Sequence, residues 1–344
     1  MIIDSHAHLI TPQSLYAFWP VLQASNGLHK NSKPSTTDEE IAACAKKNVE
    51  IMDEVGTDIQ LLSPRPFTLM HSHKKIADVK KWVELNNDMI ARTVELYPHR
   101  FRGVAGLPQV AGQPISIVFD EIDRCINELN FVGILLNPDP GEGDGQTPNL
   151  ADEYWYPLYE KMVEMDIPAH IHSAACCGRE TYSEHFISEE SLAITSISRS
   201  TVFKDFPKLK LMISHGGGSV PYQIGRWRAH HAGLAMLNYE PGAHDHNETF
   251  DDILRKFYFD TILYSKESLE LLFKVAGPDR CLFGTEKPGS GSAKDPVTGR
   301  YYDDLRPVIE DIDFLTMEQK KAIFEGNARS VFTRLDAFLR ENDR

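Results

Sequence analysis

Short apolar segments alternate with longer amphipathic segments along the whole chain. Eight of the short segments are rich in apolar and β-branched residues and predict strands over 2–8, 58–63, 101–107, 131–136, 168–172, 209–214, 256–260 and 280–284. Helical periodicity between them predicts helices over 38–55, 76–97, 115–129, 152–165 and 267–275. In 38–55, for example, Ile41, Ala45 and Met52 recur near the helical period, and the acidic residues at the start favour a helix N-terminus.

Eight strands, each followed by helical sequence, predict a (β/α)8 barrel of the TIM type, which needs roughly 250 residues before insertions. The chain has 344 residues, and we expect the extra length in insertions at 9–37, 231–252 and 285–302 and in C-terminal helices over 303–343. No linker rich in Pro, Gly or Ser divides the sequence, so a single domain over 1–344 is expected. The alternative is a doubly wound open sheet, but no GxGxxG motif opens a strand-to-helix turn.

Composition narrows the range of partners. The net charge of −14 argues against nucleic acid and anionic membranes, and the apolar runs are too short for a membrane span. No signal peptide fits before Ile2, because charged and catalytic-looking residues begin at Asp4, so a cytoplasmic location is expected. Five cysteines without a CxxC spacing argue against a disulfide framework or a zinc ribbon.

Polar residues gather where the expected strands end. His6 and His8 share one face of the first strand, a spacing that suits half of a metal site and equally two ordinary polar histidines. Charged or metal-binding residue types end most of the other strands: Arg65, Asn137, His170, His172, His215 and Glu286. Because barrels carry their catalytic groups at the C-terminal ends of strands, this distribution favours a metal site. The spacing alone leaves open which of His170 and His172 is a ligand.

The motifs together resemble a known superfamily. An HxH on the first strand, a histidine ending the fifth, HGGG at 215–218 and a carboxylate ending the eighth are similar to the amidohydrolases. Within them, the chain resembles the metal-dependent decarboxylases and hydratases related to aminocarboxymuconate semialdehyde decarboxylase. Those decarboxylases end the eighth strand in a pattern like FGSDYP, whereas residues 283–288 read FGTEKP. This glutamate, with segments such as CINELNFVGILLNPDPGEG and HGGGSVPYQIGRWR, resembles the 4-oxalomesaconate hydratase family.

The resemblance implies a reaction and a ligand set. It implies a divalent metal, expected to be Zn²⁺, held by His6, His8, His172 and Glu286. The reaction would add water to the conjugated double bond of 4-oxalomesaconate, in bacterial breakdown of protocatechuate or gallate. Glu286 would also take the proton from water, and His215 would stabilise the intermediate or relay a proton. Tyr182 and Lys287 are further candidate proton donors, and a homo-oligomer is expected because such assemblies are common in the family.

The implied substrate carries three carboxylates, which arginine binds through its planar fork. The candidates are Arg65, Arg226 and Arg228, with Asn137 and Tyr302 as neutral partners. Arg226 and Arg228 stand two apart in a helical stretch, so at most one of them is expected to face the site. The other histidines, including His71 and His185, are expected on the surface or on helix faces.

Three alternatives stay open. A nonoxidative decarboxylase of a related unsaturated or aromatic acid would use the same ligands, although Glu286 in place of aspartate speaks against it. A hydrolase of a cyclic ester or amide is a second alternative, because the superfamily hosts many activities. A catalytically silent barrel that binds an anionic metabolite is the third, and the complete set of ligand-type residues at the strand ends speaks against it.

Overall fold

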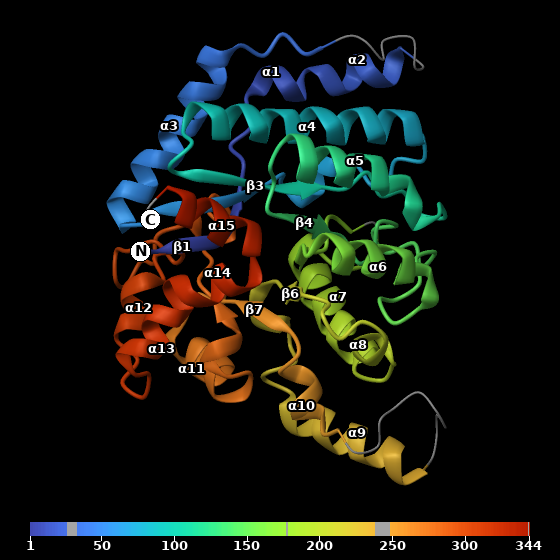
Figure 1. Cartoon of the computed structure of the whole chain (residues 1–344), viewed down its shortest axis with the longest axis vertical. Helices are drawn as coiled ribbons and strands as arrows, with labels where there is room; N and C mark the ends of the chain where they lie inside the picture. Colours follow the sequence, from blue (N-terminus) through green and yellow to red (C-terminus); the bar gives the residue numbers. More distant parts are fainter. Residues whose placement is uncertain (26–32, 177, 238–247, 343) are drawn as a thin grey trace.

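In the computed structural model of the chain, eight parallel strands form one sheet in sequence order (Figure 1). The structure describes residues 1–25, 33–176, 178–237, 248–342 and 344. The strands are β1 (Ile3–His8), β2 (Ile59–Ser63), β3 (Phe101–Gly106), β4 (Gly133–Leu136), β5 (Ala169–Ile171), β6 (Leu211–Ile213), β7 (Tyr258–Asp260) and β8 (Cys281–Leu282). Each of these lies within the segment predicted for it, so the pattern of apolar runs located all eight strands.

The sheet curls into a nearly closed barrel. The Ser5 amide donates to the Phe283 carbonyl at 2.8 Å, and the Glu286 amide donates to the His6 carbonyl at 2.7 Å. These bonds bring the segment that contains β8 beside β1, which an open doubly wound sheet would not do. The barrel prediction is confirmed, and the strand ends that carry polar residues meet at one end of it.

Helices pack around the outside of the strands (Figure 1). Their bounds are α1 (Gln13–Tyr16), α2 (Phe18–Ala24), α3 (Asp38–Val55), α4 (Ile76–Leu96), α5 (Phe119–Asp123), α6 (Tyr156–Met165), α7 (Tyr182–Ile197), α8 (Val202–Asp205), α9 (Ile224–Leu237), α10 (Phe250–Leu254), α11 (Lys266–Val275), α12 (Arg306–Glu310), α13 (Met317–Lys321), α14 (Asn327–Val331) and α15 (Thr333–Glu341). Helix α3 has the predicted bounds because Thr37 and Glu40 form a capping box at its N-terminus and Gly56 ends it at φ 75°.

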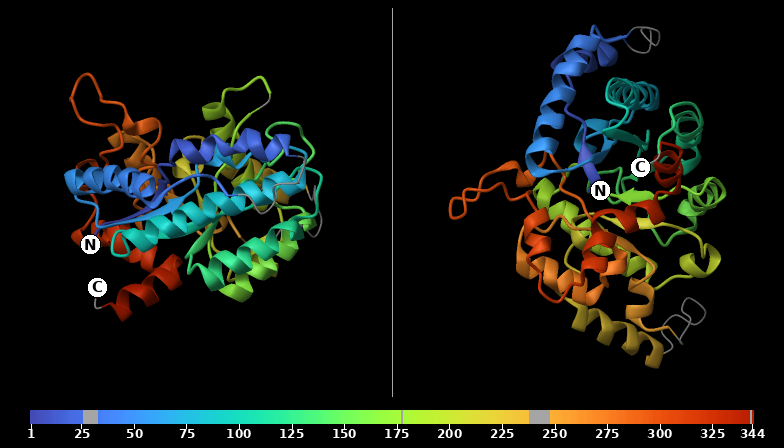
Figure 2. Two further views of the ribbon diagram at one scale, coloured as in Figure 1. Left: turned by 90° about the horizontal axis from the view of Figure 1, so that it is seen from above. Right: turned by 60° about the vertical axis from the view of Figure 1, so that its left-hand side comes forward.

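The expected insertions are present. Residues 9–37 contribute α1 and α2, and residues 285–302 form the orange loop that extends from the body in Figure 2. The parts of the insertions at 26–32 and 238–247 lie outside the described residues. Along β1 to β6 every residue is buried, as expected for parallel strands covered by helices. Among the helices in the described part of the chain, none is long and apolar enough to cross a membrane.

Candidate metal centre

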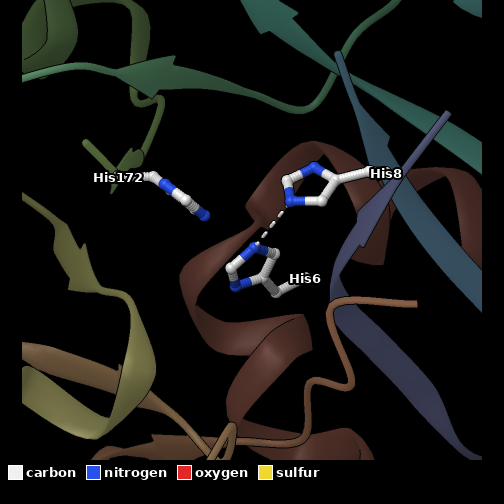
Figure 3. A group of neighbouring side chains, drawn as sticks. All are labelled: His6, His8 and His172. Atoms are coloured by element: carbon white, nitrogen blue, oxygen red, sulfur yellow. Dashed lines mark hydrogen bonds between the residues drawn. The ribbon is translucent and has the colours of Figure 1, made fainter. Parts of the chain in front are cut away.

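Three histidine rings converge at the strand-end side of the barrel. His6 and His8 come from β1, and His172 directly follows β5, with 1–3% of each residue exposed. Figure 3 shows the three rings facing a common space. One ring nitrogen of each lies within 4.8 Å of the others, a separation that one cation can span.

The opposite side of each ring fixes its tautomer. The His172 Nδ1 lies 2.6 Å from the Ser173 carbonyl oxygen, which can only accept, so Nδ1 carries the hydrogen. The His6 Nδ1 donates in the same way to Asp260 at 2.8 Å, because the pKa of Asp260 lies well below its usual range. Burial raises that pKa, and hydrogen bonds from His170 and His6 outweigh the burial. The Nε2 lone pairs of His6 and His172 therefore point into the shared space.

His8 completes the arrangement. Its Nδ1 lies 3.0 Å from the Ser63 hydroxyl, which can itself donate to the Ala7 carbonyl at 3.4 Å. With the hydroxyl turned to Ala7, Nδ1 donates to Ser63 and Nε2 carries a lone pair. The Nε2 atoms of His6 and His8 are then two acceptors only 3.4 Å apart, the contact drawn as a dashed line in Figure 3. The buried Nε2 of His172 has no hydrogen-bond partner among the described residues. A cation shared by these lone pairs satisfies all three nitrogens.

The pKa values of His8 and His172 also fit a cation site. Burial lowers the pKa of His8 and His172 well below the usual histidine range, and the other histidines of the cluster lower it further. Both rings are therefore neutral near pH 7, the form in which imidazole binds a metal. The donor set of imidazoles and a carboxylate suits zinc and also manganese or iron.

Glu286 is the candidate carboxylate of this donor set. Its Oε1 lies 4.0 Å from the His172 Nε2 and 3.4 Å from the His215 Nε2. Burial raises the pKa of Glu286, but the hydrogen bond and charge of His215 outweigh burial and bring that pKa well below its usual range. Glu286 adopts a left-handed conformation at φ 60°, which costs on the order of 1–3 kcal/mol and is found mainly at functional sites.

His215 is held between two carboxylates. Its Nδ1 lies 2.8 Å from the Glu190 Oε1, and its ring stacks on Phe186 at 5.8 Å. Burial alone would lower the pKa of His215, but Glu190 and Glu286 raise it well above its usual range. His215 can therefore hold a proton beside Glu286, as a relay or as a stabiliser of negative charge.

Asp4 and His170 lie behind the candidate ligands. Asp4 accepts from the His6 amide, the Gln60 side chain and both the amide and hydroxyl of Thr285, which ties β1 to the segment that carries Glu286. Its burial raises the pKa to about 6 against these hydrogen bonds. The His170 Nε2 lies 2.8 Å from the Ser214 hydroxyl and 3.6 Å from Asp260, so it is engaged away from the open side of the cluster.

A cavity of about 820 Å³ opens over the cluster. It is lined by His8, His172, Glu286 and the predicted residues Arg65 and Tyr182, with apolar walls from Phe67 and Phe186. The Arg65 Nη2 donates to the Pro288 carbonyl at 2.9 Å, which fixes the guanidinium at the wall and leaves other donors available.

The other predicted residues do not line the cavity. Asn137 is buried and bonds to His71 and to the Asp139 amide. The Lys287 ammonium pairs with Asp303 at 2.8 Å. Arg226 and Arg228 are both exposed on α9, where Arg228 pairs with Asp251, and Tyr302 is 40% exposed in the loop after β8. The expectation of a surface or helix-face position is wrong for His71, which is 1% exposed in a turn. His185 does lie on a helix, α7, but its side chain is buried, with 4% exposed.

Sequence reasoning missed three groups of the site. Asp260 ends β7 in the same way that the histidines end their strands, so the strand-end rule would have found it. Tyr264 and Glu190 carry no such signal, because one lies in the loop after β7 and the other on a helix. In the folded chain, Tyr264 lies against Glu286 and Glu190 lies against His215.

Residues 3–334 match the amidohydrolase family, and the chain belongs to that family. The chain is 36% identical to 2-keto-4-carboxy-3-hexenedioate hydratase of a Sphingobium species, over 99% of this chain and 98% of the relative. The crystal structure of 4-oxalomesaconate hydratase from Rhodopseudomonas palustris superposes with a TM-score of 0.85 at 37% identity, covering 100% and 99% of the two chains.

Decarboxylases are more distant relatives. Gamma-resorcylate decarboxylase of a Rhizobium species is 27% identical over 70% of this chain and 75% of its own. A dihydroxybenzoic acid decarboxylase from a Polaromonas species, solved with bound manganese, shares the fold at a TM-score of 0.69 and 21% identity, covering 96% of each chain. The expected superfamily and its hydratase branch are confirmed by these similarities.

Proposed function

We propose that this chain is a metal-dependent hydratase. It adds water to the conjugated double bond of 4-oxalomesaconate, or of its oxo/enol tautomer, and gives 4-carboxy-4-hydroxy-2-oxoadipate. The observation that carries the proposal is the carboxylate of Glu286 4.0 Å from His172 of the three-histidine cluster, in a chain that is similar to two hydratases over nearly its full length. The reaction would belong to the catabolism of protocatechuate or gallate.

The proposed metal ligands are His6, His8, His172 and Glu286, and the proposed metal is Zn²⁺. A divalent cation bound there would lower the pKa of water to about 7 and so supply a nucleophile at neutral pH. The neutral tautomers and the unpaired Nε2 of His172 support this ligand set.

Each protein group has a defined task in the addition. Glu286 accepts a proton from the attacking water, whose oxygen forms a bond to the carbon β to the ketone. The electrons of the double bond move onto the ketone oxygen, and His215 stabilises that charge and relays a proton to the α carbon. The sum is one added water, with no other reactant.

The cavity supports recognition of an anionic substrate. Arg65 is the proposed partner of one carboxylate, because its guanidinium lines the cavity and is held by the Pro288 carbonyl. Tyr182 lines the same cavity and is a candidate proton donor. Lys287 is a less favourable donor, since Asp303 already binds its ammonium group.

Mass spectrometry of the product tests the proposal. The metal-loaded enzyme is incubated with 4-oxalomesaconate, and a gain of one water that a chelator abolishes is the expected result. Loss of carbon dioxide would identify a decarboxylase, and an unchanged substrate would reject this substrate. The Glu286→Gln variant should lose turnover while circular dichroism shows an intact fold, and full activity in it would reject Glu286 as the base.

A further inference from the structure

Helix α7 contacts two separate groups of ionisable side chains. Its residues Phe186 and Glu190 touch His215 of the candidate metal centre. Its residues His185 and Glu189 turn instead toward Asp139, which follows β4. The hydration mechanism proposed above uses none of Asp139, His185 and Glu189.

The second group has the geometry of a cation site. One donor atom from each of Asp139, His185 and Glu189 lies within 4.8 Å of the other two. Asp139 and His185 are 8% and 4% exposed, and Glu189 is half-buried. A nitrogen and two carboxylate oxygens form a donor set that suits zinc, manganese or iron.

The His185 ring points its buried Nε2 into this group. That atom makes no hydrogen bond within the described residues, and its contact is an ion pair with the Asp139 Oδ2 at 3.4 Å. Asp139, and to a smaller extent Glu180, raise the pKa of His185, so a cation there would compete with a proton. On the other side of the ring, Nδ1 lies 3.5 Å from the Glu180 Oε2. A carboxylate behind a ligating imidazole is the usual arrangement at metal sites, because it orients the ring and raises its basicity.

The surroundings carry an excess of negative charge. Burial, followed by the charges of Asp139, Glu180 and Glu190, raises the pKa of Glu189 to about 7 against the lowering effect of His185. Burial and Asp139 also raise the pKa of Glu142. A single imidazole faces these carboxylates, so a divalent cation would remove repulsion that the histidine alone cannot balance.

We propose that Asp139, His185 and Glu189 form a second divalent-cation site, for an ion of the zinc or manganese type. The ion fastens the N-terminal half of α7 to the segment after β4. It thereby positions Phe186 and Glu190, which follow His185 and Glu189 directly in sequence, against His215. Binding displaces any proton from His185, because only the neutral ring is a ligand.

Metal stoichiometry tests the site. The full-length protein is equilibrated with Mn²⁺ or Zn²⁺, freed of excess ion and analysed by elemental mass spectrometry. We expect two ions per chain in the wild type and one in His185→Gln and in Glu189→Gln. The control His99→Gln changes an exposed histidine and should retain two ions.

A second background separates this site from the first. In a His6→Asn, His8→Asn variant we expect one remaining ion, and adding Glu189→Gln should remove it. This result would stand even if the proposed hydratase reaction failed. One ion per chain in the wild type, unchanged by His185→Gln and Glu189→Gln, would overturn the site and leave His185 as a protonated partner of its carboxylates. If His185→Gln does not fold, the ion count of Glu189→Gln, a change at a half-buried position, tests the site.

Discussion

The phenol of Tyr264 donates a 2.6 Å hydrogen bond to the Oε2 of Glu286. This bond fixes which carboxylate oxygen is engaged, and it leaves Oε1 directed toward the Nε2 atoms of His172 and His215. Both residues adopt left-handed backbone conformations, at φ 55° for Tyr264 and φ 60° for Glu286. The carboxylate is thus held in one orientation by its own backbone and by a neighbouring loop.

Removing this hydrogen bond should slow turnover. In Tyr264→Phe, Glu286 loses a donor to a charged oxygen, an interaction that contributes about 1.5–3 kcal/mol, so kcat should fall roughly 10- to 100-fold. Steady-state kinetics and metal analysis on the same preparation check this, because the bound ion should be retained. Tyr222→Phe, at a side chain 80% exposed, is the control, and equal kcat in both variants would contradict the role of Tyr264.

Arg65 should act on substrate affinity. Replacing it with methionine removes the only arginine that lines the cavity among the described residues, and KM for the tricarboxylate should rise roughly tenfold or more. The matched change Arg226→Met alters an exposed arginine outside the cavity and should leave KM unchanged. A larger effect of Arg226→Met than of Arg65→Met would move the carboxylate site to α9.

Replacing His170, within β5, and replacing His172, directly after β5, should have different effects on the metal content. His172→Asn removes an unpaired lone pair from the cluster, so the ion count per chain should fall by one. His170→Asn removes a ring already engaged by Ser214 and Asp260, and the count should stay the same. Elemental analysis after dialysis measures both, and the opposite pattern would make His170 the ligand.

Buried His71 predicts a pH dependence of stability outside the metal centre. Burial lowers its pKa to about 4, so between about pH 6.5 and pH 4 the unfolded chain binds the proton more tightly and stability falls as pH falls. This residue alone should account for about 2 kcal/mol of unfolding free energy lost from pH 7 to pH 5. Urea unfolding of the wild type and of His71→Gln at pH 7 and pH 5 checks this. The free energy of unfolding of the variant should fall by about 2 kcal/mol less than that of the wild type. An equal loss in both proteins would show that His71 does not titrate in this way.

The barrel could be predicted because its strands are periodic and local. Each apolar run is a property of a few neighbouring residues, and Thr37, Glu40 and Gly56 define the ends of α3 in the same local way. The convergence of His6 and His8 with His172, and of His172 with Glu286, also followed, because strand ends in a barrel share one edge. Position along a strand therefore translated directly into position in space.

The remaining groups depend on side-chain direction and on loops, which sequence spacing does not determine. Arg228 reaches Asp251 and Lys287 reaches Asp303, so each cation finds a nearby carboxylate away from the cavity. The spacing left open whether His170 or His172 is a ligand, and the hydrogen-bond partners of the two rings favour His172, as the family resemblance did. Tyr264 reaches Glu286 across 22 positions of sequence, from a loop without periodicity.

The bonds between Ser5 and Phe283 and between His6 and Glu286 join the first and last strands, the junction at which the barrel closes. The proposed ligands His6, His8 and Glu286 lie on both sides of this junction. An ion bound to them would therefore hold β1 and the segment after β8 together. Losing it should let that junction open more often than the rest of the barrel. Hydrogen exchange of the amides of Ser5 and Glu286 should therefore accelerate in the metal-free protein, while the amides between β4 and β5 remain protected.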